Sequence, residues 1–194
     1  MRITNGDNNP YVSKDGNNES VCIQILYGIL PKMTKLQGKE GVAILLHDIR
    51  STHNVGSIFR TADALGVSKI YISGYTPLPV DKFKRPRKDI AKVALGAEKT
   101  IAWEYVADTK LLIRTLKKQK YSVVGLEQSE HSVDYKKLAP KFPLLFIVGN
   151  EVAGIEKGIM SLCDSIVEIP MKGEKESLNV SVAFGVALYR ILDI

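Results

Sequence analysis

The chain has 194 residues, of which 45% are hydrophobic and 25% are charged, and its formal net charge is +6. This length and composition are typical of one globular domain with a real core, and the positive charge favours an anionic partner such as nucleic acid. The two cysteines exclude a disulfide framework, the three histidines lack metal-ligand spacing, and no apolar run is long enough to cross a membrane. The sequence therefore predicts a cytoplasmic protein without a metal site.

Residues 1–40 are expected to form a flexible extension and linker. The first twenty residues are rich in Asn, Gly, Asp and Ser and contain little apolar surface. Residues 21–30 are more apolar and fit either a helix or a strand, and a linker-like stretch follows them. The compact domain is predicted to cover 41–194.

From residue 41 onward, short β-rich segments alternate with helical patterns. The predicted strands are 42–46, 69–72, 101–105, 121–126, 144–148 and 165–169. The predicted helices are 55–65, part of 88–98, 108–119, 155–163 and 177–192, with Gly66 ending the first of them. This alternation predicts an α/β fold, with a parallel six-stranded sheet covered by helices on both faces.

The segment 81–92, DKFKRPRKDIAK, is the most basic part of the chain. Two prolines before it and one within it favour a loop at its start. A solvated surface loop is the simplest interpretation of such a charge run. The alternative is an RNA contact, in which cations bind phosphate and Phe83 contacts a base. The candidate RNA-binding residues in this segment are Lys84, Arg85, Arg87 and Lys88, and Arg50 is a further candidate nearer the first strand.

Ligands of α/β sheets bind beyond the carboxyl ends of the strands, so the segments that follow the strands are the candidates for a site. HDIRSTHNVGSIFR follows the first strand, Glu127 follows the fourth, GNEVAGIEKG follows the fifth, and PMKGEKESLNVS follows the sixth. No GxGxxG motif follows a strand, which argues against a dinucleotide site. The glycine spacing after the fifth strand resembles a P-loop, but Ile155 and Glu156 replace the required Lys and Ser/Thr, so the chain is not an NTPase of that kind.

Each of these loops also has a purely structural interpretation when it is taken alone. The polar junction before residue 55 fits a long helix cap as well as a ligand loop. Glu151 fits an exposed turn, and Ser177 fits the cap of the last helix with Asn179 in its first turn. These alternatives remain open for each residue considered by itself.

The three motifs taken together are more specific. HNVGSIFRTADALG, GNEVAGIEKGI and ESLNVSVAFGVALYRIL occur in this order, each after a predicted strand. They resemble the signature motifs of the SpoU (TrmH) family of RNA 2'-O-ribose methyltransferases, in the SPOUT superfamily. The resemblance extends over about residues 41–194. The second motif departs modestly from the pattern, because Asn150 separates its glycine and glutamate.

The resemblance implies an enzyme that transfers a methyl group from S-adenosylmethionine to a ribose 2'-hydroxyl, and a C-terminal deep trefoil knot. By similarity, the catalytic residues are Arg60, Asn54, Glu151, Ser177 and Asn179. Arg60 is the leading one, and two roles are open for it: general base, or donor that holds phosphate and stabilises the developing alkoxide. The second is physically easier, because a guanidinium rarely loses its proton.

The resemblance also implies that the cofactor is held largely by backbone groups of the knot loops. The corresponding positions are Leu126, Glu127, Gly149, Ile169, Met171 and Leu178. Homodimers are usual in the superfamily, and the final helix offers a candidate contact face at Val180, Val182, Phe184, Val186 and Leu188, although the same residues fit ordinary core packing.

RNA is the predicted partner of the chain. tRNA is slightly favoured, because residues 1–40 are too short and polar to form an additional RNA-binding domain. Methylation of rRNA is an alternative. A catalytically inactive RNA-binding protein of the same fold and a base methyltransferase of the knotted superfamily are further alternatives, which the intact motif residues disfavour.

Overall fold

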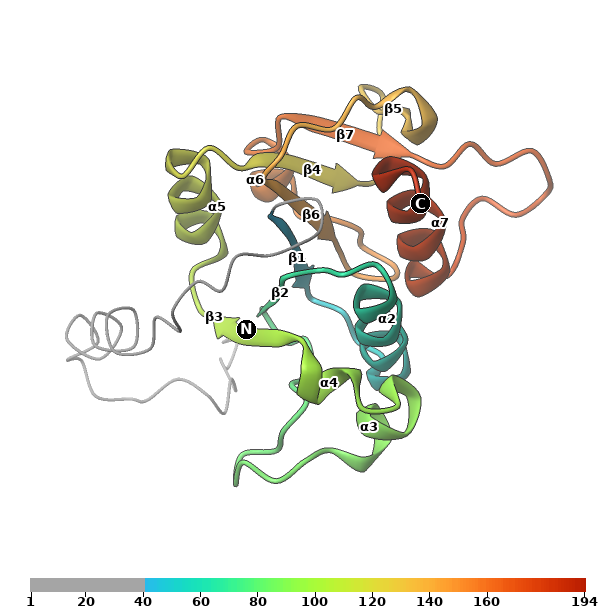
Figure 1. Cartoon of the computed structure of the whole chain (residues 1–194). Coiled ribbons are helices and arrows are strands. Elements are labelled where there is room, and N and C mark those ends of the chain that lie inside the picture. Colours follow the sequence, from blue (N-terminus) through green and yellow to red (C-terminus); the bar gives the residue numbers. More distant parts are fainter. Residues whose placement is uncertain (1–40) are drawn as a thin grey trace, which may run out of the picture.

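The computed structural model describes residues 41–194 (Figure 1). The segment 1–40, predicted to be a flexible extension and linker, lies outside the described residues. The strands are β1 (Val42–His47), β2 (Lys69–Ser73), β3 (Ala102–Val106), β4 (Ser122–Leu126), β5 (Val133–Asp134), β6 (Leu144–Val148) and β7 (Ser165–Glu168). The helices are α2 (Thr52–Ala64), α3 (Lys88–Ala94), α4 (Ala97–Thr100), α5 (Thr109–Lys118), the 3-10 turn η1 (Tyr135–Lys137), α6 (Lys157–Met160) and α7 (Val180–Leu192).

The strands form one parallel sheet in the order β3-β2-β1-β6-β4-β7-β5. The predicted parallel α/β architecture is therefore confirmed, but the predicted number of six strands is wrong, because the sheet within residues 41–194 has seven. The additional strand, β5, pairs only Val133 and Asp134 with β7. Two residues are too few to produce the alternating pattern by which a strand is detected in a sequence.

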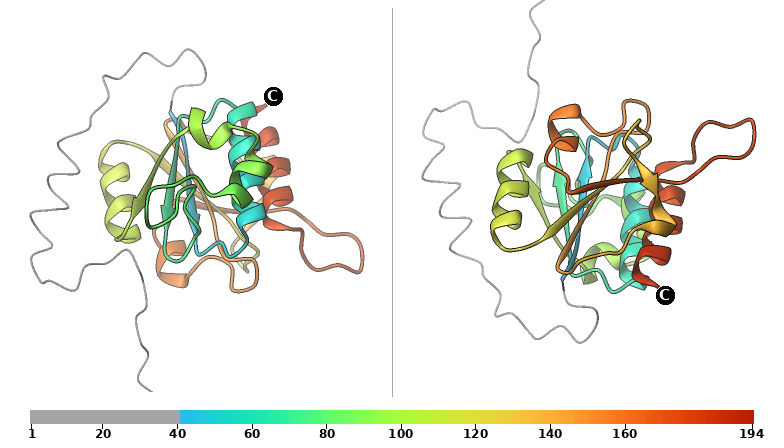
Figure 2. Two further views of the ribbon diagram at one scale, coloured as in Figure 1. Left: turned by 90° about the horizontal axis from the view of Figure 1, so that it is seen from below. Right: turned by 90° about the horizontal axis from the view of Figure 1, so that it is seen from above.

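Helices cover both faces of the sheet, as predicted, and two separate hydrophobic clusters hold them there. One cluster joins α2, α3, α4 and α7 to residues such as Ile44 and Phe146. The other joins α5 and α6 to the opposite face, with Ile113 and Ile159 packed against Leu45. Figure 2 shows α2 and α7 side by side on one face and α5 on the other.

The central strands explain the strongest signals in the sequence. All residues of β1 and β6 are buried, as expected for strands with a covered face on each side. Because every strand pair is parallel, the loops after β1, β2, β4, β6 and β7 leave the sheet at the same edge. That edge carries all three sequence motifs.

Several helix boundaries differ from the predictions. Helix α2 begins at Thr52 rather than residue 55, because Ser51 is its N-cap and accepts a hydrogen bond from the Asn54 backbone. Helix α6 is confined to four residues, and α7 begins at Val180 rather than residue 177. The end of α2 agrees with the prediction, since Gly66 follows its C-cap residue with φ of 67°.

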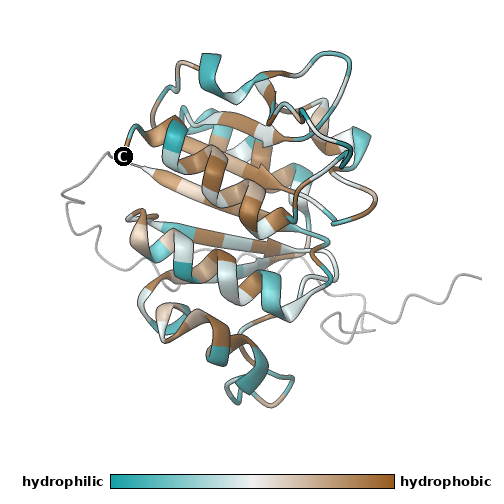
Figure 3. Cartoon of the chain, turned by 90° about the vertical axis from the view of Figure 1, so that its right-hand side faces the viewer, coloured by the Kyte–Doolittle hydropathy of each residue, from teal (hydrophilic) through white to brown (hydrophobic). Residues whose placement is uncertain are grey.

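Among the apolar side chains of α7 that are candidates for a dimer contact, some are buried and others are exposed. Phe184 and Leu188 are fully buried in the core, whereas Val182 and Val186 are exposed. In Figure 3, α7 is largely brown where it crosses the visible face beside the more polar α2. Core packing therefore explains the first two residues. The exposed apolar stripe consists of Val182, Val186 and Tyr189, at positions i, i+4 and i+7 of the helix.

Candidate active site

A cavity of about 230 Å³ lies at the carboxyl edge of the sheet. Three loops line most of its wall: residues 126–128 after β4, residues 149–154 after β6, and residues 168–178 after β7. The start of α7 closes it through Val180 and Ala183. Segments that are far apart in the sequence thus meet at one concave site, which is the usual place for a ligand in a parallel α/β fold.

The six residues predicted to hold the cofactor all line this cavity. They are Leu126, Glu127, Gly149, Ile169, Met171 and Leu178. Gly149 allows the closest backbone approach in the wall, because a Cβ atom there would lie 2.5 Å from the Gly154 carbonyl oxygen and 2.7 Å from the Ile155 nitrogen. The structure therefore brings these six residues together in one cavity wall. Their contact with a cofactor stays a prediction.

Side-chain hydrogen bonds tie the three loops together. The Glu127 carboxylate accepts a hydrogen bond of 2.7 Å from the Ile155 backbone, which connects the β4 and β6 loops. The Gln128 amide donates to the Glu176 carbonyl over 2.8 Å and connects the β4 and β7 loops. The wall is thus built by mutual contacts between loops, rather than by one preformed turn.

The lining of the cavity is acidic. Glu127, Glu151 and Glu168 all contribute to it, and Glu168 also accepts a hydrogen bond of 2.7 Å from the Ser132 hydroxyl. Carboxylates in a concave, partly dry site attract positive charge. Within residues 41–194, no group of three or more His, Cys, Asp or Glu side chains is arranged to hold a metal ion.

Glu151 connects the second motif to the start of α2. Its carboxylate accepts hydrogen bonds from the Arg50 backbone at 2.9 Å, the Ser51 backbone at 3.1 Å and the Asn54 amide at 2.8 Å. The negative charge also lies at a helix N-terminus, where the helix dipole favours it. Burial raises the pKa of Glu151, but the hydrogen bonds from Arg50, Asn54 and Ser51 outweigh it, and the net pKa lies below its usual value.

Asn54 and Asn179 extend this cluster to the third motif. The Asn179 amide donates a hydrogen bond of 3.1 Å to the Asn54 side-chain oxygen. Asn179 is also the N-cap of α7, because its oxygen accepts hydrogen bonds from the Ser181 backbone and hydroxyl. The interpretation of Ser177 as the cap is therefore wrong, since the helix starts three residues later. The buried Asn54 belongs to the first turn of α2, not to its entrance.

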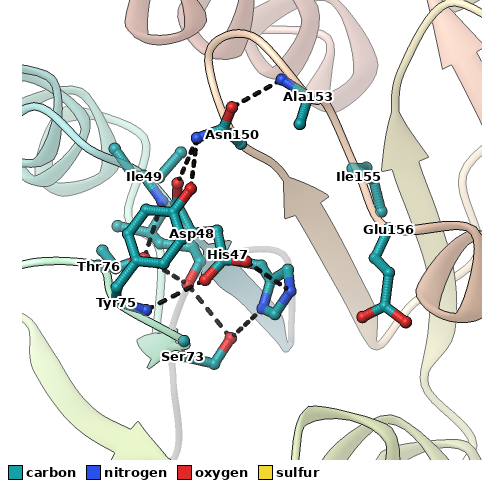
Figure 4. A network of polar contacts seen from close by, with 12 residues as sticks. His47, Asp48, Ile49, Ser73, Tyr75, Thr76, Asn150, Ala153, Ile155 and Glu156 are labelled. Carbon is teal, nitrogen blue, oxygen red and sulfur yellow. Dashed lines mark hydrogen bonds and ion pairs between the residues drawn. The ribbon is translucent and has the colours of Figure 1, made fainter. Parts of the chain in front are cut away.

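A second polar network surrounds Asn150 (Figure 4). The buried Asn150 amide donates to the Asp48 carbonyl at 2.9 Å and to the Tyr75 hydroxyl at 2.7 Å. Its oxygen accepts from the Val152 and Ala153 backbones at 2.8 and 2.7 Å. All of its hydrogen-bonding capacity is thus used to hold the loop that carries Glu151 against the loops after β1 and β2.

The ends of β1 and β2 also fix each other. His47 Nδ1 lies 2.8 Å from the Ser73 hydroxyl, both side chains being buried. Asp48 has φ of 57°, a conformation that Asp tolerates better than most residues. Its carboxylate accepts from the Tyr75 backbone at 3.1 Å, and a Cβ at Gly74 would collide with it. The chain leaving β1 is therefore rigid where Arg50 and Ser51 meet Glu151.

Arg60 and Ser177 lie apart from the cluster. Arg60 is exposed on α2, and a separation of six residues from Asn54 places it about 9 Å further along the helix axis. Ser177 is exposed in the loop before α7 and lines the cavity. Among the hydrogen bonds of residues 41–194, none joins either side chain to Asn54, Glu151 or Asn179. The catalytic roles of Arg60 and Ser177 therefore stay predictions.

The candidate RNA-binding residues fall into two places. Arg50 is exposed next to Glu151, at the edge of the cavity. The other four lie in the loop between β2 and α3 and at the start of that helix. There Arg85 forms an ion pair with Asp81 at 2.7 Å, and Arg87 forms one with Asp89 at 2.8 Å. The two lysines of this group, Lys84 and Lys88, are exposed.

The sequence interpretation missed three residues that shape the site. Asn150 was treated as a variable position of its motif, yet it is the hub of the network in Figure 4. Tyr75 and Glu168 were not predicted to take part in the site at all. For Asn150 a signal was present, because an Asn directly after a strand often bonds the backbone two residues ahead. Tyr75 and Glu168 gave no comparable local signal.

A model of the SpoU rRNA methylase family matches residues 41–189, which include the first two motifs and all but the last three residues of the third. The chain belongs to this family. It is 34% identical over 157 residues to a protein of Staphylococcus saprophyticus that is assigned to the TrmH family of tRNA/rRNA methyltransferases, covering 81% of this chain and 60% of that protein.

Other relatives agree with this assignment. The 23S rRNA (guanosine-2'-O-)-methyltransferase RlmB of Ralstonia nicotianae is 34% identical over 160 residues, covering 79% of this chain and 60% of that protein. The chain thus spans about three fifths of the length of the curated relatives that it matches.

Solved structures confirm the fold. An AdoMet-bound rRNA methyltransferase from Sinorhizobium meliloti superimposes with a TM-score of 0.71 at 28% identity, covering 79% of this chain and 56% of that one. The A. aeolicus TrmH/SpoU tRNA modifying enzyme superimposes with a TM-score of 0.70 at 27% identity, covering 80% of this chain and 76% of that one. The predicted resemblance to the SpoU family is therefore confirmed. In the described part of the chain no helix is long and apolar enough to span a membrane.

Proposed function

We propose that this member of the SpoU family transfers a methyl group from S-adenosylmethionine to a ribose 2'-hydroxyl of RNA. One observation carries the proposal: the loops of the second and third motifs line one cavity, and Glu151 of its wall is hydrogen-bonded to Asn54 of the first motif, which in turn bonds Asn179 of the third. The Sinorhizobium relative that bound AdoMet in its crystal has the same fold.

The residues of the cavity fit this cofactor. When bound, S-adenosylmethionine supplies an activated methyl group on a positively charged sulfur. Glu127 and Glu168 provide negative charge in the wall, and Gly149 lets the loop after β6 fold closely onto its own backbone at Gly154 and Ile155, which shapes the wall. Apolar side chains of Leu126, Ile169 and Leu178 suit the faces of an adenine ring.

The catalytic contribution of the chain is positioning and charge stabilisation. Asn54 is fixed by both Glu151 and Asn179 and thereby positions the start of α2, where the helix N-terminus attracts an RNA phosphate. The guanidinium of Arg60 binds the phosphate next to the target ribose and stabilises the oxygen as its proton leaves. Because Arg60 and Ser177 are exposed and are not hydrogen-bonded to the frame of Asn54, Glu151 and Asn179 in residues 41–194, we infer that bound RNA brings them into one site.

We further propose that the active form is a homodimer and that the C-terminal part of the chain is knotted. The dimer proposal is supported by the exposed stripe Val182, Val186 and Tyr189 on α7, beside the loop that carries Ser177. The knot proposal is supported by membership of the family and by the packing of the β7–α7 segment against the loops after β4 and β6.

Transfer RNA is the substrate that we propose. Its support is the structural match to the A. aeolicus TrmH/SpoU tRNA modifying enzyme, which covers 80% of this chain and 76% of that one. The relatives themselves include both a 23S rRNA methyltransferase and a tRNA modifying enzyme.

The test is an assay of the full chain with methyl-labelled S-adenosylmethionine and either total tRNA or total rRNA, followed by nucleoside analysis. We expect label in 2'-O-methylated nucleosides of tRNA. Label in rRNA alone would overturn the substrate, label on a base would overturn the reaction type, and RNA binding without label would indicate an inactive binding protein.

A further inference from the structure

Phe83 lies at the tip of the loop between β2 and α3 and is 64% exposed. Most large apolar side chains of the described chain are buried in its two cores, so an exposed phenylalanine in its most basic segment requires an explanation. This loop, residues 80–86, extends away from the body of the molecule before α3 (Figure 1).

The loop has a defined conformation. Val80 and Pro86 form an antiparallel bridge across its base, and the Asp81 backbone donates a hydrogen bond of 2.8 Å to the Arg85 carbonyl. The Asp81 carboxylate accepts from the Phe83 backbone at 2.8 Å and from the Arg85 backbone at 2.9 Å. The tip that presents Phe83 is therefore organised before any ligand binds, which reduces the entropy lost on binding.

Two cations accompany the aromatic ring. Lys82 Nζ lies 5.1 Å and Arg85 Cζ lies 4.9 Å from the ring centroid. Arg85 is anchored, because its Nε and terminal nitrogen both bond the Asp81 carboxylate. Burial of a nucleobase against Phe83 stabilises more than an exposed cation–π contact does. A base can therefore replace Lys82 over the ring, and the displaced ammonium is then close enough to bind a phosphate.

We propose that Phe83 is a stacking platform for an unpaired base of the RNA substrate, with Lys82 and Lys84 binding the adjacent phosphates. The ligand is an unpaired nucleotide rather than a duplex, because a paired base has both of its faces covered by its neighbours. The loop leaves the same edge of the sheet as the cavity, two strands from β6, so one RNA molecule contacts both. This inference rests on the proposed activity towards RNA.

The test compares F83A, F83L and F83W with the full-length wild type, using a short RNA hairpin with an unpaired loop and a fully paired duplex of equal length. We expect F83A and F83L to weaken hairpin binding about tenfold and to leave duplex binding unchanged, whereas F83W retains the affinity. K84A is the matched control. K84A should weaken the binding of both RNAs and should reduce the salt dependence of that binding. F83A should leave the salt dependence unchanged.

The outcomes separate this inference from the proposed function. Wild-type hairpin affinity in F83L, or equal weakening of hairpin and duplex in F83A, would overturn the stacking platform while methyl transfer by the wild type stands. If the wild type binds neither RNA and methylates none, the proposed function fails and the platform fails with it. Because the side chain is mostly exposed, circular dichroism should show unchanged folding in all three variants.

Discussion

The two halves of the predicted catalytic set differ in how much of their bonding capacity is already used within the chain. Asn54, Glu151 and Asn179 bond one another or the backbone at the start of α2. Arg60 and Ser177 are exposed, and neither is hydrogen-bonded to these three within residues 41–194. The comparison indicates that the first group builds a fixed frame, and that the second group acquires its partners from substrate. Variants of the two groups should therefore fail in different ways.

The largest effect is expected from a substitution of Arg60, which should lower turnover without changing cofactor affinity or stability. R60A should lower kcat by about 100-fold or more, because it removes the charge that stabilises the forming oxyanion. The dissociation constant of S-adenosylmethionine and the thermal midpoint should stay close to wild type, since the side chain is exposed. Single-turnover kinetics and calorimetric titration measure the two quantities. Turnover close to wild type in R60A would remove Arg60 from the chemistry, and R60K tests whether charge alone suffices.

A substitution of Gly149 tests how the loop that carries Glu151 shapes the cavity. In G149A the new Cβ meets the backbone at Gly154 and Ile155, where no flexible side chain can give way. We expect the loop to shift, with a loss of about 1–3 kcal/mol of stability and weaker cofactor binding. G173A is the matched control, because a Cβ at Gly173 meets nothing within 4 Å. If cofactor affinity were equal in the two variants, the cavity would not be the cofactor site.

The charge of Glu151 should make the stability of the protein depend on pH. Its pKa in the folded state lies below the usual 4.5, so the stabilisation is complete above pH 4.5 and is lost as the pH falls through the lower folded value. E151Q should therefore be less stable than wild type by about 1–2 kcal/mol at neutral pH, and the difference should shrink as the pH falls further below 4.5. Urea unfolding at several pH values measures this difference, and a constant difference between the two proteins would contradict it.

The smallest effect is expected at Tyr75. Y75F removes one hydrogen bond to Asn150 at a residue that is 60% exposed. We expect a loss of about 0.5–1 kcal/mol in unfolding free energy, with a small fall in kcat as the Glu151 loop loosens. N150A removes all four hydrogen bonds of the buried amide, so it should lower the unfolding free energy by more than Y75F does. Equal stability of Y75F and N150A would show that Asn150 does not organise the loop.

The sequence predicted those parts of the fold that depend on local pattern. The runs of apolar residues in β1 and β6 identified buried parallel strands, and Gly66 marked the end of α2. The two-residue β5 and the shortened α6 were not predictable, because a strand or helix of so few residues is defined by the neighbour it pairs with. The starts of α2 and α7 were also misplaced, at 55 and 177 instead of Thr52 and Val180, since several polar residues precede each helix and the pattern did not single out the capping one.

By itself, the sequence of this protein determined the parallel α/β architecture and its membership of the SpoU family, because both depend on apolar periodicity and on motifs that can be read residue by residue. Only the tertiary structure decided which polar side chains meet. Asn54 and Glu151 are 97 residues apart, and Asn54 and Asn179 are 125 apart. Their hydrogen bonds exist because parallel strands deliver their loops to one edge of the sheet, and a directional bond of about 3 Å depends on that placement, not on residue type alone.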